Sequence, residues 1–276
     1  MQSLMKWAFL GNNEFYTNKL KTLAKNDLPP EKWSYAGKND FGILKSYLNF
    51  TFERLWQERD AAPEEDKQTY IYMDKKTGVS CFNTGLYDKT WQPIYFYCET
   101  NHIPNHQVWR FKSFHNSYTI KYTSMASAWV TNLRRANYFQ DPGALIFDVN
   151  LDIVPQWNHI IYEEENYLRI PEQLRNNGQE YCQNVINGAI DFVKKRIAAN
   201  YKTIVPQFYK KKIQLLAPLY LTNQDKPDLA LVLSLSDDKT VYYGHTCITT
   251  EMAYNNARLL ARPDSYWLQQ QNRIPP

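Results

Sequence analysis

Residues 241–268, VYYGHTCITTEMAYNNARLLARPDSYWL, form the stretch that decides the fold. The first third reads as a strand. Either Thr249 or Thr250 can cap the helix that follows, because a hydroxyl side chain accepts a hydrogen bond from the first free N–H groups. Glu251 lies in the first turn, where the positive end of the helix dipole favours a carboxylate. Pro263 stops the helical pattern. A strand that turns sharply into a helix predicts a sheet with a helix on its edge.

Free backbone N–H groups at such a junction are a common setting for a phosphate. Polar side chains lie close to this junction in the sequence, namely His245, Thr246, Tyr254, Asn256 and Arg258. The stretch therefore predicts either a binding site at the mouth of the final helix or a capped C-terminal helix without a ligand.

Two helical patterns open the chain. Residues 14–26 are weakly amphipathic, and residues 41–59 place apolar side chains at i+3 and i+4 spacing. An acidic segment that contains a proline, 61–67, separates both from the rest of the chain. We therefore expect a helical annex at residues 1–66 and an α+β main domain at residues 67–276, or a single compact domain overall.

The hydrophobic period changes to two from residue 69. Residues 70–73 and 79–82 flank the turn DKKTG, which predicts a hairpin with Gly78 at its bulge position. Further strands are expected at 93–98, 108–111, 145–148, 151–153, 157–162, 212–218, 228–234 and 241–248. The pattern also predicts a long helix at 179–201 and a loop at 200–207, and residues 125–135 could form a helix. Strands with long helices inserted between them indicate an α+β fold, with a largely antiparallel sheet on which one long and several shorter helices pack.

The strand that begins at Val79 turns abruptly polar at Asn83 and Thr84. A buried strand that presents an amide beside a hydroxyl must satisfy both groups internally or offer them to a ligand. Both explanations remain open from the sequence.

The composition permits nucleic-acid binding without requiring it. Lysine and arginine number 32 against 28 acidic residues, and basic clusters at 134–135, 194–196 and 210–212 carry much of the excess. Aromatic residues make up 15% of the chain, a high share. Such side chains can stack on bases, or they can form an aromatic core with wet edges.

The cysteines and histidines show no metal-binding pattern. The four cysteines lack C-x-x-C spacing and lie in apolar or amphipathic runs, which indicates reduced core thiols in a cytoplasmic protein. Pro104 interrupts the pair His102 and His106, so we expect no metal site. No segment is long enough to span a bilayer, and the first residues carry no convincing secretory signal.

Six segments, in order along nearly the whole chain, carry a family resemblance. They are L-x-x-Y-L-x-F-T-F-E-R-L at 44–55, C-F-N-T-G-L at 81–86, R-A-N-Y-F-x-D-P-x-x-L-I-F-D at 135–148, N-Y-K-T-x-x-P-Q at 200–207, K-I-Q-L-L-x-P-L at 212–219 and Y-Y-G-H-T-C-I-T-T-E-M-A-Y-N-N-A-R-L at 242–259. Together they resemble the family catalogued as domain of unknown function 3825. Members of that family are often joined to LOTUS-type and cold-shock RNA-binding domains. The resemblance therefore implies an RNA or nucleic-acid setting and assigns no mechanism.

The first functional hypothesis is an enzyme that processes or joins nucleic-acid ends by phosphoryl or nucleotidyl transfer. His245 would act as general acid or base, with Lys202 and Arg258 on the phosphate. The expected substrate-binding residues are Asn83, Thr84, Arg135, Gln207, Thr246, Tyr254 and Asn256. A ligase-like variant would use ATP, a divalent metal and Lys202 as nucleophile. The K-x-x-G motif at 75–78 is similar to that of a nucleotidyltransferase but also fits a plain hairpin turn.

Two alternatives from other classes stay open. A non-catalytic module would bind single-stranded RNA or another nucleic acid by stacking its aromatic side chains on bases, while basic loops follow the backbone. A protein-interaction component of a phage-conflict or stress system would instead bury the same polar residues in a satisfied internal network. All of these hypotheses depend on which of these residues meet in space.

Overall fold

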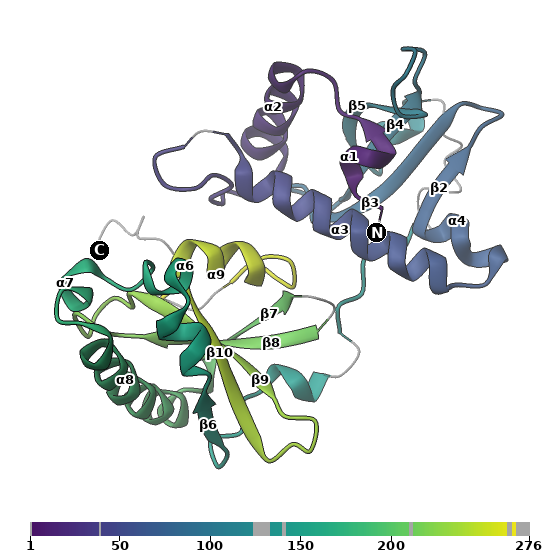
Figure 1. Cartoon of the computed structure of the whole chain (residues 1–276). Coiled ribbons are helices and arrows are strands. Elements are labelled where there is room, and N and C mark those ends of the chain that lie inside the picture. Colours follow the sequence, from purple (N-terminus) through teal and green to yellow (C-terminus); the bar gives the residue numbers. More distant parts are fainter. Residues whose placement is uncertain are drawn as a thin grey trace. The chain divides into compact units, whose positions relative to one another are not determined.

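The strands form two separate five-stranded sheets (Figure 1), whereas a single sheet was expected. The α+β class and the mostly antiparallel pairing are confirmed. The computed structural model describes residues 2–38, 40–123, 133–139, 142–209, 212–263 and 267–268. The chain divides into two compact units, Met1–Asn137 and Tyr138–Pro276, and each unit contains one sheet.

The sheet of the first unit has the strand order β1-β5-β4-β3-β2. Only the β1–β5 pair is parallel. The strands are β1 (Ala8–Phe9), β2 (Ile71–Asp74), β3 (Val79–Tyr87), β4 (Pro93–Thr100) and β5 (Trp109–Asn116). The helices are α1 (Leu4–Trp7), α2 (Asn13–Thr22) with a π-helical turn at Leu23–Asp27, α3 (Gly42–Ala61) and α4 (Lys67–Tyr70), with 3-10 turns at Glu64–Asp66 and Thr119–Tyr122. The predicted hairpin at 70–82 is therefore confirmed, with Gly78 at a positive φ of 71°.

The N-terminal helices belong to this first unit, because their apolar faces need the sheet as a partner. The stripe on α3 that the sequence predicted is fully buried, and its Phe52 ring lies 5.3 Å from the ring of Phe82 on β3. Phe82 in turn stacks on Phe96 of β4 at 4.9 Å. The boundary between the two units thus falls after Asn137 rather than near residue 66, since a helix with one apolar stripe cannot bury it alone.

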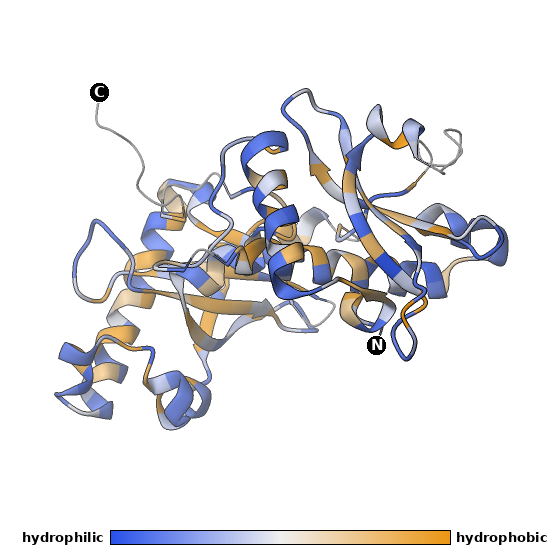
Figure 2. Ribbon diagram, turned by 90° about the horizontal axis from the view of Figure 1, so that it is seen from above, coloured by the Kyte–Doolittle hydropathy of each residue, from blue (hydrophilic) through white to orange (hydrophobic). Residues whose placement is uncertain are grey.

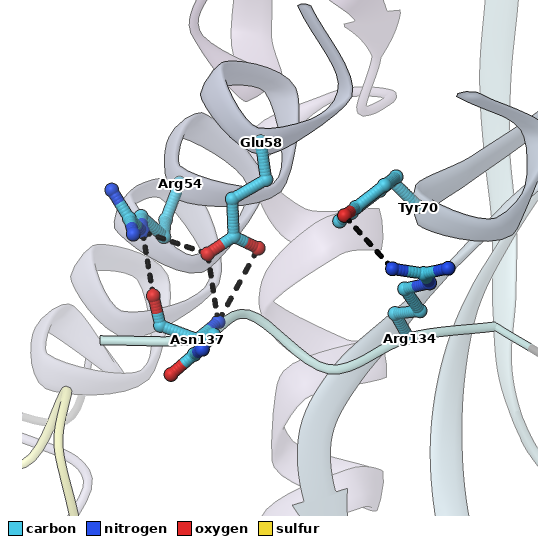
Figure 3. A network of polar contacts seen from close by, with 5 residues as sticks. All are labelled: Arg54, Glu58, Tyr70, Arg134 and Asn137. Atoms are coloured by element: carbon cyan, nitrogen blue, oxygen red, sulfur yellow. Dashed lines mark hydrogen bonds and ion pairs between the residues drawn. The ribbon is translucent and has the colours of Figure 1, made fainter. Parts of the chain in front are cut away.

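Residues 133–137, the last of the first unit, run across its helices as a short segment that we call the strap (Figure 3). Asn137 N–H donates to the Glu58 carboxylate at 3.0 Å, while Arg54 Nε donates to Asn137 O at 2.8 Å and pairs with Glu58 at 2.9 Å. Arg134 donates to Tyr70 Oη at 3.1 Å and pairs with Asp66. One arginine of the basic pair 134–135 is therefore a structural clamp within the unit.

The sheet of the second unit has the strand order β6-β10-β9-β8-β7, with β6 and β10 parallel. The strands are β6 (Asp152–Pro155), β7 (Val205–Tyr209), β8 (Lys212–Leu219), β9 (Leu229–Leu235) and β10 (Val241–Thr249). The helices are α6 (Glu164–Tyr167), α7 (Glu172–Arg175), α8 (Gln179–Ala199) and α9 (Thr250–Ala257), with a π-helix at Asn158–Tyr162 and 3-10 turns at Pro142–Leu145 and Tyr201–Thr203.

The long helix α8 covers one face of this second sheet. Its Ile186, Ile190 and Val193 pack in one core cluster with Leu231 and Leu233 of β9. The apolar residues of the helices and strands recur as bands along the ribbon (Figure 2), as the helical and alternating periods predicted. Thr249 caps α9, since its hydroxyl accepts from Met252 N–H at 3.2 Å.

Several predicted elements in the second unit were wrong. Residues 145–148 form no strand, because a 3-10 turn occupies Pro142–Leu145. Residues 157–162 contain a π-helix, because two adjacent isoleucines there are both buried and no alternation exists. The expected loop at 200–207 contains the start of edge strand β7, where Pro206 is tolerated. The possible helix at 125–135 lies mostly outside the described residues, and 133–135 are not helical.

Asp88 fixes the tip of the β3–β4 hairpin. Its Oδ1 accepts from Thr90 N–H at 2.8 Å, the Thr90 hydroxyl at 2.7 Å and Gln92 N–H at 2.9 Å. Its Oδ2 accepts from Asn116 at 2.8 Å. Burial alone would raise the pKa of Asp88, but these hydrogen bonds from Gln92, Asn116 and Thr90 outweigh it and leave the pKa below its usual value.

Asp88→Asn is expected to lower the free energy of unfolding by about 2 kcal/mol at pH 7, because the charge is lost and the second oxygen, which accepts from Asn116, is replaced by a donor. A folded-state pKa below the unfolded one stabilises the fold above the unfolded value of about 3.9, and the gain disappears as the pH falls through the folded pKa. Urea unfolding of both proteins at pH 7 and at pH 3 measures this. The difference between them should shrink at pH 3, and an unchanged difference would contradict the assignment.

Candidate functional site

Asn83 and Thr84 lie inside the first unit rather than on its surface. They are 4% and 0% exposed. The Asn83 amide donates to Leu133 O at 3.2 Å and accepts from Gly85 N–H at 2.9 Å. The Thr84 hydroxyl donates to Ile94 O at 2.7 Å. Both side chains thus stabilise the irregular end of β3 and its contact with the strap, and we do not include them in the site.

Arg135 is the predicted substrate-binding residue that the first unit does expose. Its guanidinium lies over the Tyr87 ring, 5.1 Å from the centroid, and donates to the Tyr87 hydroxyl at 3.2 Å. The neighbouring Gly85 adopts a positive φ of 76°, and an added Cβ there would come within 2.9 Å of the Tyr47 hydroxyl. The arrangement leaves Arg135 at the edge of an aromatic surface, where a phosphate can reach it.

Gln207 and Asn256 are brought together in the second unit as part of a polar row. Asn256 donates to Gln207 at 3.0 Å, Gln207 donates to Gln214 at 3.0 Å, and Gln214 donates to the Ser234 hydroxyl at 3.0 Å. The row crosses β7, β8 and β9 on the sheet face opposite α8 and joins α9 to that face. Gln207 is buried, so this row is an internal network of the kind that the third hypothesis expected.

Thr246 on β10 and Tyr254 on α9 lie near that row. The Thr246 hydroxyl is buried with no hydrogen-bond partner among the described residues. Tyr254 is buried on α9, and its carbonyl accepts from Arg258 N–H at 2.9 Å. Tyr254 thus belongs to the packed face of α9, whereas the Thr246 hydroxyl, which lacks a partner in the described part of the chain, costs free energy where it lies.

His245 is the extra residue of a β-bulge in β10, since Gly244 pairs with Leu233 and Thr246 pairs with Val232. Its ring Nδ1 lies 2.9 Å from Gln156 Oε1 on the segment that follows β6. Burial, and then the nearby His159, lower the pKa of His245, so its imidazole is neutral at neutral pH. A neutral ring is chemically able to accept a proton.

Lys202 lies beside edge strand β7 of the sheet that carries His245. It precedes β7, whereas His245 lies on β10, and three strand spacings of about 4.8 Å separate these strands by about 14 Å. Lys202 borders a mostly apolar hollow of about 300 Å³ with Pro206 and Leu260. The proposed general acid or base and the proposed nucleophile therefore start from strands that are three positions apart in the sheet.

The second hollow, of about 600 Å³, lies in the first unit and is rich in cations. The β2–β3 hairpin contributes Lys75 and Lys76, and β5 contributes Arg110 and Lys112. Its other lining residues are Thr77, Gly78, Val79, Glu99, Thr100, His102 and Ile103. Gly78 permits the close turn, because an added Cβ would come within 2.9 Å of the Thr100 hydroxyl.

Positive charge exceeds negative charge in this basic hollow. Four lysine and arginine side chains face one carboxylate, Glu99. Glu99 lies opposite Arg110 in the strand register, yet its carboxylate pairs with Lys112 at 3.0 Å and accepts from the Tyr97 hydroxyl at 3.1 Å. Within the described part of the chain, the half-buried Arg110 guanidinium makes no hydrogen bond or ion pair. An unpaired, partly desolvated guanidinium favours binding of an anion.

Sequence reasoning missed Arg110 and Lys112. The signal was present as R-F-K-S in β5, where cations alternate with buried aromatic residues beside the KK hairpin. Arg110 and Lys112 come to lie beside the hairpin lysines only because β5 pairs with β4 and β4 pairs with β3. This pairing cannot be inferred from the sequence of a single strand. The turn at 75–78 was recognised and interpreted as a plain hairpin, which it also is.

The fold and these surfaces define a two-unit α+β protein with a basic hollow. In the described part of the chain, no three or more His, Cys, Asp or Glu side chains are grouped so that they could hold a metal ion. No helix there is both long and apolar enough to cross a membrane. The chain belongs to the family described as a domain of unknown function (DUF3825), which matches residues 24–267. A search of curated proteins gave no match, and a search of solved structures gave none.

Proposed function

We propose that this protein binds nucleic acid through phosphate contacts in the basic hollow of its first unit, with RNA as the expected partner. The observation that carries the proposal is the half-buried Arg110, which lines the hollow without a partner among the described residues. Lys75 and Lys76 approach from the facing hairpin, so more than one phosphate can be contacted at once. Cations arranged along two neighbouring segments suit a repeating backbone better than a single phosphate.

The catalytic alternative has less support from the geometry. His245, Lys202 and Arg258 were expected to act on one phosphodiester, but the strand that carries His245 and the strand that follows Lys202 are three spacings apart, about 14 Å. Arg258 directly follows α9, and its backbone N–H is used at the end of that helix. A binding function requires no such convergence, so we infer a binding module rather than an end-joining enzyme.

Binding of a fluorescent 12-nucleotide single-stranded RNA to the whole protein, followed by anisotropy at about 50 mM salt, tests the proposal. We expect saturable binding that ATP and inorganic phosphate displace only weakly, since each offers few phosphates. Absence of binding at low salt would overturn the proposal.

A parallel incubation with labelled ATP and Mg²⁺ separates binding from catalysis. A binding module leaves no covalent label on the chain. Stable adenylate on a lysine would instead restore the ligase-like alternative.

A further inference from the structure

We propose that the β3–β4 hairpin tip and the turn after β5 form a base-stacking platform, which makes the protein selective for unpaired, single-stranded nucleic acid. This inference rests on the proposed function and adds a second contact, at the other end of the β3 strand from the basic hollow. The platform consists of Tyr87, Trp91, Tyr118 and Tyr122.

Trp91 is the most exposed tryptophan of the described chain, at 75%. It lies at a positive φ of 63°, a conformation that favours glycine and that costs energy for a bulky residue. The tip keeps it there, since Trp91 N–H donates to Asp88 O at 3.0 Å and the Asp88 carboxylate ties down both neighbours. Because the backbone of the tip is fixed by these hydrogen bonds, stacking of a base on Trp91 requires little further ordering of the loop.

Two exposed tyrosines lie on the neighbouring turn. Tyr118 and Tyr122 are 63% and 76% exposed, their rings lie 5.6 Å apart, and their hydroxyls are 3.2 Å apart. The turn is joined to the hairpin tip, because Ser117 donates to Gln92 at 3.1 Å and Asn116 donates to Asp88. Four aromatic side chains are therefore presented by two connected loops of one unit.

Charge around the platform favours a polyanion over an apolar partner. Lys89 and Lys121 are exposed on the loops that carry it, and the exposed Arg135 lies over the Tyr87 ring of the Tyr87–Trp91 pair. The acidic groups nearby are Asp88, whose oxygens are occupied by its four donors, and Asp27. Exposed rings interleaved with cations are the pattern by which proteins hold single strands, since each base has a face to stack.

The platform and the basic hollow lie at the two ends of β3. Val79, which lines the hollow, pairs with Glu99 of β4, and Tyr87 of the platform pairs with Pro93, so six residue steps of about 3.3 Å along β4 separate them by about 20 Å. A single strand must be several nucleotides long to reach both ends, within the usual site size of about 4–16 nucleotides. A trinucleotide can occupy only one of them.

Trp91→Ala tests the platform when wild type and variant are titrated with 12-nucleotide RNA, the same sequence as a duplex, and inorganic polyphosphate. We expect the variant to bind the single strand at least about fivefold more weakly, because base stacking is lost. Polyphosphate has no bases, so its affinity should not change. Trp91→Phe should recover most of the loss, and Phe50→Ala, an exposed aromatic on α3, should bind as wild type does.

The outcomes separate the two proposals. Equal binding of the single strand by wild type and Trp91→Ala would overturn the platform and leave the basic hollow as the site. Equal binding of duplex and single strand by the wild type would overturn it as well. A wild type that binds neither RNA nor polyphosphate would instead overturn the proposed function itself.

Discussion

Arg110→Glu is expected to weaken binding of 12-nucleotide single-stranded RNA by about 10- to 100-fold at 100 mM salt. A hydrogen bond between charged groups contributes about 1.5–3 kcal/mol, and each 1.4 kcal/mol corresponds to a tenfold change. Reversing the charge also places a second carboxylate opposite Glu99 in the basic hollow, which repels phosphate. Fluorescence anisotropy measures the change directly.

Two further variants make this result specific to the site. Arg110→Gln removes the charge without adding a repulsive one and should weaken binding about tenfold. Lys38→Glu makes the same charge change on an exposed loop of the first unit and should lie within about twofold of wild type. If the two charge reversals weaken binding equally, only the net charge matters and the basic hollow is not the site. Urea unfolding of Arg110→Gln establishes that the fold is intact.

Phe82→Ala is expected to lower the free energy of unfolding by about 3–5 kcal/mol, the largest stability effect that we predict. The ring is fully buried and lies between Phe96 at 4.9 Å and Phe52 at 5.3 Å, with Trp7 at 6.0 Å. Its removal leaves a cavity where the sheet meets α3 and takes away aromatic contacts on three sides. Urea denaturation monitored by circular dichroism gives the value.

Phe50→Ala is the matched comparison for that substitution. Phe50 lies on the same helix as Phe52 but is 42% exposed, so its loss should cost less than about 1 kcal/mol. A similar cost for both substitutions would mean that the aromatic cluster around Phe82 is not the core of the first unit.

Much of the fold could be predicted from the periodic spacing of hydrophobic residues alone. The apolar stripe of α3, the β2–β3 hairpin and the long helix α8 were predicted because each contains enough residues to establish one period. The π-helix at Asn158–Tyr162 and the edge strand β7 were not, since a short segment with a proline or two adjacent isoleucines fits several structures. The division into two sheets depends on pairing between distant strands, which local period does not encode.

The candidate site was less predictable than the fold. Polar residues in unusual sequence positions, such as Asn83 and Gln207, turned out to be satisfied internally, because a buried amide must find partners wherever it lies. Arg110 looked ordinary in an alternating strand and gained significance only when the hairpin lysines were placed beside it. Trp91 was one aromatic among many until its exposure was known.

The dependence of RNA affinity on salt tests the central claim most directly. For a single strand, the logarithm of the association constant falls with the logarithm of salt concentration by about 0.7 per phosphate contacted. We predict a clear negative slope for the wild type between about 50 and 200 mM salt, and a slope shallower by about 0.7 for Arg110→Gln. An affinity independent of salt, or a slope that the substitution leaves unchanged, would contradict phosphate binding in the basic hollow.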